Sequence, residues 1–586
     1  VLLKDYHNIC VPLPFIVDRL KHIMNLLRIV LVISVFKLHA QKPIDSNYFS
    51  NPLEIPMILS GSFGELRSNH FHSGLDIKTQ QKSGIPIYAP ADGYVSRIKV
   101  AHYGYGKALY IKHPNGYSTV YAHLQKFETS IQDYVKQSQY KKEQYEIELF
   151  PKQNSLLVKK GDLIAYSGNS GSSGGPHLHY EIRDSFSRPM NPMLFGLEIP
   201  DTKNPAVTSV FAYPVGEKAS VNQSAEPVKL RLIKQKDGTY KTEKISAYGK
   251  IGFGVATTDQ QNGAYNKNGV YRIKTSFNGK PKIDIGFEKF SFDETRYLNR
   301  YIDYTYFKDH KIKIQKLFRQ TNNPLSIIKQ EDDNGFVRVA EGYSSNFTIE
   351  IKDYQGNLTQ ITIPVIGKKD SLGVKKQTPK DLQYVPSANS SSVQRGIFTI
   401  NFPKNALYQG SYLDIKTTGD TLHLHTDNIP VHKNISISMD ISNYNTTDKN
   451  KLYIARQVYK NISFYTPTRR EDNILTAKTR TLGSYTLAMD TIAPSVKAAN
   501  FTDGKWISNN KTLQLKIEDT HSGISSYRAT LNGKFILMEY NYKKDVLTYD
   551  FNDNRVADTQ NNLRLIVTDN VGNSTTFEAI FFRKKL

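Results

Sequence analysis

The stretch "GGPHLHYE", from Gly174 to Glu181, places two histidines two positions apart in an apolar-flanked run. Alternate side chains of a β-strand point to the same side, so a strand here would aim the imidazoles of His177 and His179 at one spot. Two imidazoles in a sheet can also be half-buried structural groups. The pair alone does not separate these interpretations, and the rest of the chain has to decide between them.

A second group of ligand-type residues lies about a hundred residues earlier, in "NHFHSGLDI". The spacing of His72 and Asp76 can bring both side chains onto one cation. Three nitrogen or oxygen ligands and an open water position are the arrangement of a catalytic zinc site, and this donor set suits zinc better than a metal that prefers soft ligands. His70 competes with His72, but only His72 has an aspartate four residues on, so we expect His70 to line the wall.

Short apolar segments separated by Gly, Pro and Asn run through this part of the chain. They are "GIPIYAPADGYVSRIKV" (84–100), "GKALYIKH" (106–113), "STVYAHL" (118–124) and "GDLIAYSG" (161–168). Such segments are typical of strands, and "HPNG" at 113–116 is a hairpin turn signal. We predict an antiparallel all-β domain with a groove, interrupted at 129–147 by a polar surface helix or long loop.

Three ordered motifs in this segment carry a family resemblance: "HSGLD" (72–76), "YAHL" (121–124) and "GNSGSSGGPHLHYE" (168–181). From about Gly61 to Pro192 the chain resembles the lysostaphin/LytM-type zinc metallo-endopeptidases. The resemblance covers under a third of the chain. Carried over by motif position, it implies zinc ligands and a catalytic pair that does not bind the metal. The implied ligands are His72, Asp76 and His179, and the implied catalytic pair is His123 and His177.

The resemblance also implies a function, the hydrolysis of peptide cross-links in bacterial peptidoglycan. The two catalytic histidines would orient the attacking water, or stabilise the oxyanion and protonate the leaving amine. Which histidine is acid and which is base stays open. One alternative is a non-catalytic regulator that binds the wall and activates another hydrolase, although such relatives usually lack a metal ligand. The other is an envelope scaffold that acts through its remaining domains.

The length of the chain predicts several domains, and its net charge favours an anionic partner. A chain of 586 residues is too long for one core. The net charge is +23, of which residues 1–40 contribute +3. This excess fits cell wall, lipopolysaccharide or nucleic acid, or a basic surface that only aids solubility. We expect peptidoglycan peptides as partners, with other envelope proteins as further candidates, and no nucleic acid because export makes that partner the least expected.

The N-terminal segment predicts export. Residues 24–40, "MNLLRIVLVISVFKLHA", have the pattern of a secretory signal peptide with cleavage after Ala40, and residues 1–23 look like upstream read-through. The apolar run is too short for a bilayer span, so we expect none in the mature chain; an uncleaved anchor is the rival interpretation. The expected location is the periplasm or cell envelope. Cys10 is the only cysteine, so disulfides cannot stabilise the exported protein.

The chain after residue 200 repeats itself. Three markers recur in the same order: "DTKNPAVTSV" (201–210) with "DTIAPSVKAA" (490–499), "NGVYRIKTSFNGK" (268–280) with "GISSYRATLNGK" (523–534), and "KDYQGNLTQITIPV" (352–365) with "TDNVGNSTTFEAIF" (568–581). They predict two copies of one β-sandwich. The expected organisation of this mainly β protein is a zinc metallopeptidase domain (41–200), a sandwich with an insertion near 281–345 (201–370), a strand-rich domain (380–488) and a second sandwich (489–586).

Overall fold

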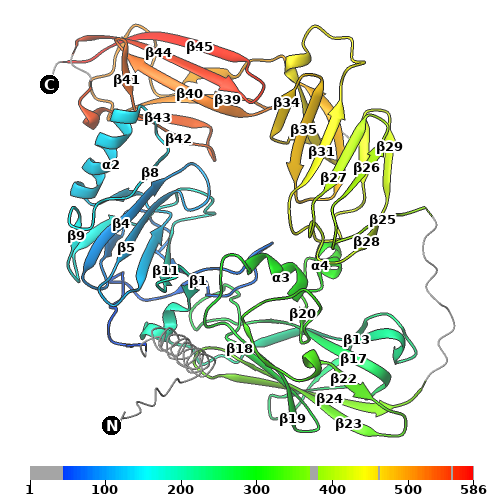
Figure 1. Cartoon of the computed structure of the whole chain (residues 1–586). Helices are drawn as coiled ribbons and strands as arrows, with labels where there is room; N and C mark the ends of the chain where they lie inside the picture. Colours follow the sequence, from blue (N-terminus) through cyan, green and yellow to red (C-terminus); the bar gives the residue numbers. More distant parts are fainter. Residues whose placement is uncertain (1–43, 370–380, 460–461, 556–557, 585–586) are drawn as a thin grey trace, which may run out of the picture. The chain divides into compact units, whose positions relative to one another are not determined.

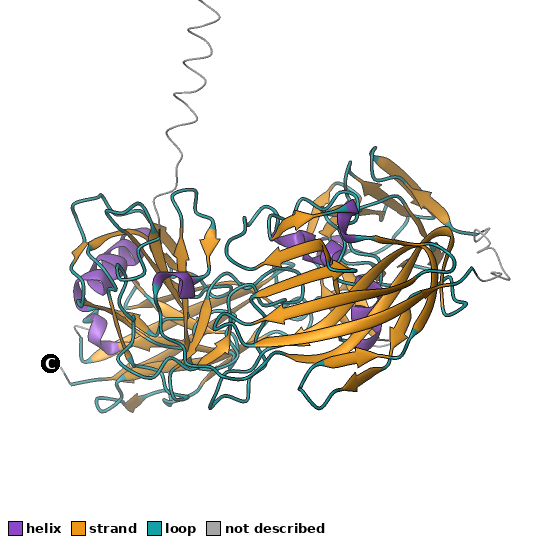
Figure 2. Ribbon diagram, turned by 90° about the horizontal axis from the view of Figure 1, so that it is seen from below, coloured by secondary structure: helices purple, strands orange, loops and turns teal. Residues whose placement is uncertain are grey.

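The computed structural model describes residues 44–369, 381–459, 462–555 and 558–584. Strands make up most of its regular structure and helices are few (Figure 2), so the prediction of a mainly β protein is confirmed. The predicted signal peptide and read-through segment lie outside the described residues.

No helix in the described ranges has both the length and the apolar character that a bilayer crossing demands.

The predicted peptidase domain contains one large sheet and one small sheet (Figure 1). Along its main path the large sheet contains β1 (Leu59–Gly61), β2 (Leu75–Lys78), β11 (His177–Arg183), β6 (Ser118–Ala122), β5 (Lys107–Lys112), β4 (Gly93–Val100) and β8 (Ile147–Leu149), with β12 (Pro189–Met190) and β9 (Leu157–Val158) paired beside it. The small sheet contains β3 (Pro86–Tyr88), β10 (Leu163–Tyr166) and β7 (Lys126–Phe127). The strands of both sheets pair in antiparallel fashion, as predicted.

Strand β11 lies between β2 and β6 and places the histidine pair in the sheet. Leu178, Tyr180 and Ile182 project from one face and are fully buried in the domain core. The alternate residues His177, His179 and Glu181 project from the other face. The pairing brings His179 opposite Asp76 of β2 and Ala122 of β6. Strand alternation therefore separates the apolar core from a polar face next to both earlier motifs.

The polar stretch after "YAHL" forms a helix, α2 (Thr129–Lys142). The Glu128 side chain caps its N-terminus by accepting from the Ser130 N–H, and Glu143 ends it in the left-handed conformation. Ile131 and Val135 bury one side of the helix, while Lys141 and Lys142 complement the dipole at its C-terminus. Of the two alternatives that the sequence left open here, the helix is the one that forms.

The segment after residue 200 continues in one twelve-stranded sheet. Its strands are β13 (Ala206–Val221), β14 (Val228–Leu230), β15 (Leu232–Lys234), β16 (Tyr240–Thr242), β17 (Ile245–Thr258), β18 (Arg272–Phe277), β19 (Lys280–Gly286), β20 (Gln315–Lys316), β21 (Ile328–Glu331), β22 (Val337–Val339), β23 (Ser344–Lys352) and β24 (Leu358–Gly367). Two short helices, α3 (Leu298–Tyr301) and α4 (Tyr304–His310), lie between β19 and β20.

The middle segment forms a two-stranded sheet and two five-stranded sheets. Its strands are β25 (Gln383–Val385), β26 (Ser391–Arg395), β27 (Phe398–Phe402), β28 (Ser411–Leu413), β29 (Ile415–Thr418), β30 (Thr421–Leu424), β31 (Ile435–Asp440), β32 (Leu452–Tyr459), β33 (Ile462–Tyr465), β34 (Thr468–Glu471), β35 (Ile474–Thr479) and β36 (Gly483–Met489). Its buried side chains, among them Phe398, Ile437 and Tyr485, form one core cluster.

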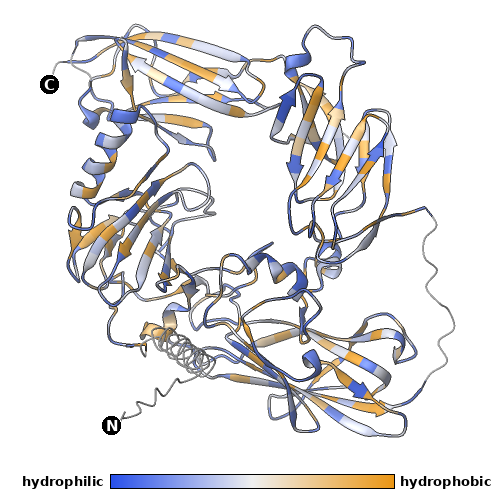
Figure 3. Ribbon diagram, viewed as in Figure 1, coloured by the Kyte–Doolittle hydropathy of each residue, from blue (hydrophilic) through white to orange (hydrophobic). Residues whose placement is uncertain are grey.

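The last segment forms a four-stranded and a five-stranded sheet over one core. Its strands are β37 (Ser495–Ala498), β38 (Lys505–Trp506), β39 (Thr512–Glu518), β40 (Ile524–Leu531), β41 (Lys534–Ile536), β42 (Met538–Asn541), β43 (Val546–Asp550), β44 (Gln560–Asp569) and β45 (Ser574–Phe582). Buried residues alternate with more exposed ones along β44, and Leu563, Leu565 and Phe581 lie in the core. Figure 3 shows hydrophilic and hydrophobic positions mixed along these strands.

The two segments that share sequence markers also share strand pairing. The pairs β13·β17, β18·β23, β18·β19 and β23·β24 of the first correspond to β37·β39, β40·β44, β40·β41 and β44·β45 of the last. Each of these pairs is antiparallel. The markers therefore fall on equivalent strands.

Candidate metal centre

Three donor atoms from separate parts of the peptidase domain converge on one point. His72 Nε2 lies 3.0 Å from Asp76 Oδ1 and 3.1 Å from His179 Nδ1, and His179 Nδ1 lies 2.9 Å from Asp76 Oδ1. All three side chains are buried. The structure thus brings together the three residues that the sequence resemblance implied as zinc ligands.

Each of the two histidine rings has a second nitrogen that points away from the converging atoms, called here the far nitrogen. Its hydrogen-bond partner determines which nitrogen of the ring carries the proton. His72 Nδ1 lies 2.8 Å from the Ser62 carbonyl, and His179 Nε2 lies 2.8 Å from Glu181 Oε1. Since both oxygens only accept, both far nitrogens carry the hydrogen, and in the neutral rings the converging nitrogens present lone pairs. Two nitrogen lone pairs and a carboxylate oxygen then face one another with no proton between them, which is the environment that a bound cation requires.

The charges around His179 lead to the same conclusion. Burial alone would lower the pKa of this ring, but its hydrogen bonds to Asp76 and Glu181 raise the pKa to about 9. A second proton on His179 is thus one way to balance the two carboxylates. A divalent cation between His72, Asp76 and His179 balances the same charges and keeps the ring neutral.

Asp76 is held so that one oxygen stays available. The guanidinium of Arg67 donates to Asp76 Oδ2 at 2.8 Å, while Oδ1 faces the two histidines. Burial opposes ionisation of Asp76, but the neighbouring His72, His177 and His179 rings hold its pKa well below the ordinary value. The carboxylate is therefore ionised and fixed in orientation, as a metal ligand must be.

Glu181 anchors the opposite side of His179. Its Oε1 also accepts from the hydroxyl groups of Ser73 and Tyr105, and its Oε2 accepts from Arg183 Nε at 2.6 Å. Glu181 is fully buried, and Arg183 and His179 together keep its pKa low despite that burial. Glu181 thus both orients His179 and forms a buried ion pair with Arg183.

The remaining two histidines lie beside the converging atoms. The rings of His123 and His177 are 4.8 Å apart, and His177 Nε2 is 3.4 Å from Asp76 Oδ1. His123 Nδ1 donates to the Ser170 carbonyl at 2.9 Å, and His177 Nδ1 donates to the Gly175 carbonyl at 2.9 Å. In both neutral rings Nε2 therefore keeps its lone pair.

The Gly/Ser loop before β11 positions both of these rings. Besides the carbonyl groups of Ser170 and Gly175, it supplies the Ser173 hydroxyl, 3.2 Å from His177 Nδ1. His123 has a left-handed backbone with φ 60°, an uncommon conformation for a residue other than glycine that is often found at functional sites. The His177 side chain is 15% exposed against 4% for His179, so His177 is the more accessible of the pair.

Two residues of the site carry no sequence signal that we recognised. Arg67 and Tyr105 reach Asp76 and Glu181 only through the tertiary fold, because neither stands in a motif. His70 is exposed and contacts Asn69, and it is not among the three converging side chains. The prediction that His70 is not a ligand therefore agrees with the geometry.

The β42–β43 hairpin of the last domain contacts the Gly/Ser loop. Lys543 Nζ donates to the carbonyl groups of Asn169 and Ser173 at 2.8 and 2.6 Å, and the Tyr542 hydroxyl donates to the Gly171 carbonyl at 3.2 Å. The loop that positions His123 and His177 is therefore itself held by the last domain.

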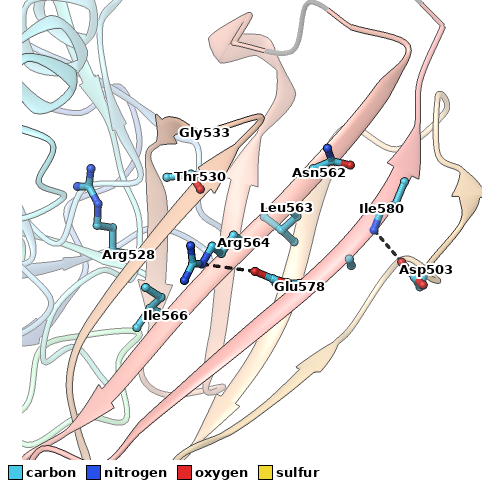
Figure 4. Close-up of a pocket in the computed structure, with 11 residues that line it drawn as sticks. Asp503, Arg528, Thr530, Gly533, Asn562, Leu563, Arg564, Ile566, Glu578 and Ile580 are labelled. Carbon is cyan, nitrogen blue, oxygen red and sulfur yellow. Dashed lines mark hydrogen bonds and ion pairs between the residues drawn. The ribbon is translucent and has the colours of Figure 1, made fainter.

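Another concave surface lies on the open face of the last domain (Figure 4). It is formed mainly by β40, β44 and β45, where Arg564 and Glu578 pair at 3.5 Å. None of its lining residues is a histidine or cysteine, and they include two arginines, Arg528 and Arg564. This surface offers no arrangement for metal-assisted hydrolysis, in contrast to the centre on β11.

Comparison with known proteins assigns a class to the segment that contains His72, Asp76 and His123. Residues 70–140 match peptidase family M23, so the chain carries a domain of that family. Residues 382–490 match the Zu5-like domain.

Three curated relatives each match a little under a quarter of the chain. A Haemophilus influenzae protein described as an uncharacterized metalloprotease is 36% identical over 133 residues, which are 23% of this chain and 22% of that protein. The DD-carboxypeptidase/endopeptidase Mpg of Neisseria meningitidis is 35% identical over 136 residues, 23% of this chain and 25% of that protein. The peptidoglycan DD-endopeptidase ShyB of Vibrio cholerae is 34% identical over 128 residues, 22% of this chain and 24% of that protein. The match thus spans about a quarter of each relative.

Proposed function

We propose that this protein is an exported zinc metallo-endopeptidase that hydrolyses peptide cross-links of peptidoglycan in the cell envelope. The observation that carries the proposal is the convergence of His72 Nε2, Asp76 Oδ1 and His179 Nδ1 on one buried point. The M23 match over residues 70–140, which include His72 and Asp76, supports the reaction class. The name of the Vibrio relative supports the substrate class.

His72, Asp76 and His179 would hold the metal, and the protein's other groups would handle protons. A zinc ion, when bound, lowers the pKa of its water to about 7 and polarises the peptide carbonyl. His123 and His177 each present Nε2 to the site with Nδ1 fixed by a carbonyl group. One Nε2 would accept the proton of the attacking water, and a protonated Nε2 would donate to the oxyanion or the leaving amine.

The charge and the location form part of the same proposal. The excess of 77 Lys and Arg over 54 Asp and Glu suits a protein that works against an anionic wall. The signal-peptide pattern at 24–40 would deliver it there. The domains after residue 200 would hold the peptidase domain near the wall or near other envelope proteins.

Incubation of the zinc-loaded protein with cross-linked muropeptides, followed by mass spectrometry, tests this proposal. We expect cleavage of the cross-linking peptide, its loss after chelation and its return on addition of zinc. A protein that binds zinc but cuts no muropeptide, either alone or after removal of residues 201–586, would overturn the proposed activity. That result would favour the regulator, which stimulation of another wall hydrolase by this protein would then identify.

A further inference from the structure

Three carboxylates meet at the entrance to the first repeated domain, away from the histidine centre. Asp201 precedes β13, Asp259 follows β17, and Asp353 lies in the turn between β23 and β24. Each offers an oxygen, and the three oxygens lie within 4.8 Å of one another. Three negative charges this close require a compensating cation or protonation.

Hydrogen bonds from the protein satisfy two of these side chains. Asp201 Oδ1 accepts from the Lys203 N–H at 3.0 Å. Asp353 accepts from the Asn357 main-chain N–H at 2.8 Å and from its side-chain amide at 2.6 Å. These bonds fix both carboxylates, and each oxygen can still accept a further interaction through its second lone pair.

Asp259 differs because one of its oxygens has no donor. Asp259 is 8% exposed, and its Oδ1 is buried with no hydrogen-bond partner in the described part of the chain. The same holds for Oδ1 of Asn268, which is 4% exposed and pairs with Asp259 in an antiparallel bridge. Paired residues of such a bridge place their side chains on the same face. Buried oxygens without partners are uncommon and point to an absent ligand.

The burial of Asp259 and the two neighbouring carboxylates disfavour its ionised form. Burial, followed by the charges of Asp353 and Asp201, raises the pKa of Asp259 to about 7. Lys203 acts in the opposite direction, but its ammonium donates to the Gln261 carbonyl at 3.5 Å. Lys203 therefore only partly compensates the three carboxylates.

The last domain repeats the arrangement with Asp490, Asp519 and Asp569. Asp490 precedes β37 and Asp519 follows β39, as Asp201 and Asp259 do in the first repeated domain, and Asp569 ends β44. There, however, main-chain donors serve the matching side chain: Asp519 Oδ1 accepts from His521 and Gly523 at 3.1 and 2.6 Å. The comparison distinguishes Asp259, whose buried Oδ1 has no donor in the described part of the chain, from its counterpart Asp519.

We propose that Asp201, Asp259 and Asp353, with the Asn268 amide oxygen, form a binding site for a hard divalent cation. The ion that this site would bind is calcium. Carboxylate and amide oxygens are the ligands that calcium takes, and the set contains no nitrogen or sulfur donor that would favour zinc. The same β23–β24 turn contacts the end of the peptidase domain, where the Tyr354 hydroxyl donates to the Met193 carbonyl at 2.8 Å. A bound ion would therefore stiffen the junction between the peptidase domain and the first repeated domain.

The test uses the full zinc-loaded chain and calcium alone as the probe. Bound calcium is counted by equilibrium dialysis for the wild type, Asp259→Asn and the control Asp284→Asn, whose parent carboxylate pairs with Arg272 instead. We expect the count to fall by one in Asp259→Asn and to stay unchanged in the control. A wild type that binds no calcium at millimolar concentration, or an unchanged count in Asp259→Asn, would overturn the site.

Hydrogen exchange provides a second reading that does not depend on a variant. Calcium added to the wild type should slow amide exchange in residues 200–206, 257–269 and 353–358. Protection restricted to other parts of the chain would contradict the proposal. Both measurements are independent of peptide hydrolysis, so their failure would leave the proposed peptidase activity untouched. In the same way, a failure to detect peptidase activity would leave the calcium site untouched.

Discussion

Glu181 accepts a hydrogen bond from His179 Nε2 at 2.8 Å, and this contact turns His179 Nδ1 toward Asp76 and His72. The two residues lie two positions apart on β11, so strand geometry alone places them on the same face. A buried carboxylate that orients a ligand histidine also makes the ring a stronger donor to a metal. The zinc affinity of the proposed centre thus depends on residues beyond the three that would bind the metal.

Replacement of Glu181 by Gln should weaken zinc binding. The amide keeps an acceptor for His179 but removes the charge, so we expect zinc affinity to fall about 10- to 100-fold. Competition with a chromophoric chelator measures the change. The control is Glu148→Gln, because Glu148 forms an exposed pair with Arg97 outside the centre. Equal zinc affinity in Glu181→Gln and the wild type would contradict the orienting role of Glu181.

Replacement of Arg67 by Met should also weaken zinc binding, through Asp76. Arg67 holds Asp76 Oδ2 at 2.8 Å, and without it the carboxylate is free to rotate away from the histidines. We expect zinc affinity to fall about 10-fold with little change in overall fold, since Arg67 is partly exposed. The same chelator competition measures it. Unchanged affinity would mean that the two histidines alone keep Asp76 in place.

His113 should make the peptidase domain less stable in acid. Burial lowers the pKa of this ring to about 4, against 6.5 for the ordinary group. The unfolded chain therefore binds more protons than the folded one between these values, so stability is full above about pH 6.5 and falls as the pH drops toward 4. The shift corresponds to about 3 kcal/mol in total, of which about 2 kcal/mol is lost by pH 5.

The variant His113→Gln isolates this effect. It loses the bonds of the ring to the Asp92 carbonyl and the Thr119 hydroxyl, so it should be less stable than the wild type at pH 7.5. The difference between the two proteins should shrink at pH 5, because only the wild type has the buried ring to protonate. Urea unfolding, followed by hydrogen exchange in β5 and β6, measures it. A difference that stays constant with pH would contradict the assignment.

Replacement of Lys543 by Ala should change turnover without changing zinc content. Lys543 binds the carbonyl groups of Asn169 and Ser173 in the loop that positions the two proposed catalytic histidines. The β42–β43 hairpin occupies these carbonyl groups, and if a substrate peptide has to reach them, kcat/KM should rise several-fold in the variant. Lys544→Ala, next in the chain, is the control. A fall in activity would instead show that Lys543 keeps the loop in its productive form.

The sequence was sufficient to predict the strands of the peptidase domain and to identify the motif residues of the centre. Alternation in "HLHYEIR" predicts which side chains share a face, and the spacing of His72 and Asp76 allows both to reach one point. These are local relations, and the mainly β class follows from many of them together. The roles of the five motif residues stay predictions until metal content and turnover are measured.

Contacts made across strands were not accessible from the sequence. Arg67 meets Asp76 nine residues away, and Tyr105 meets Glu181 seventy-six residues away, through pairings that no spacing rule specifies. The repeat markers contained Asp201 and Asp353, yet their proximity to Asp259 depends on how the ends of three strands meet. Residue types and their alternation predict which side chains share a face of a strand. Which strand ends lie next to one another can be seen only in the tertiary structure.

The most direct test of the central claim compares zinc content with muropeptide turnover in His72→Ala and His177→Ala. We predict that His72→Ala loses zinc and activity together. His177→Ala should keep about one zinc per chain and lose about 10²- to 10⁴-fold in kcat, the usual contribution of a positioned acid or base. Full zinc in His72→Ala, or wild-type turnover in His177→Ala, would contradict the division of this centre into ligands and catalytic histidines.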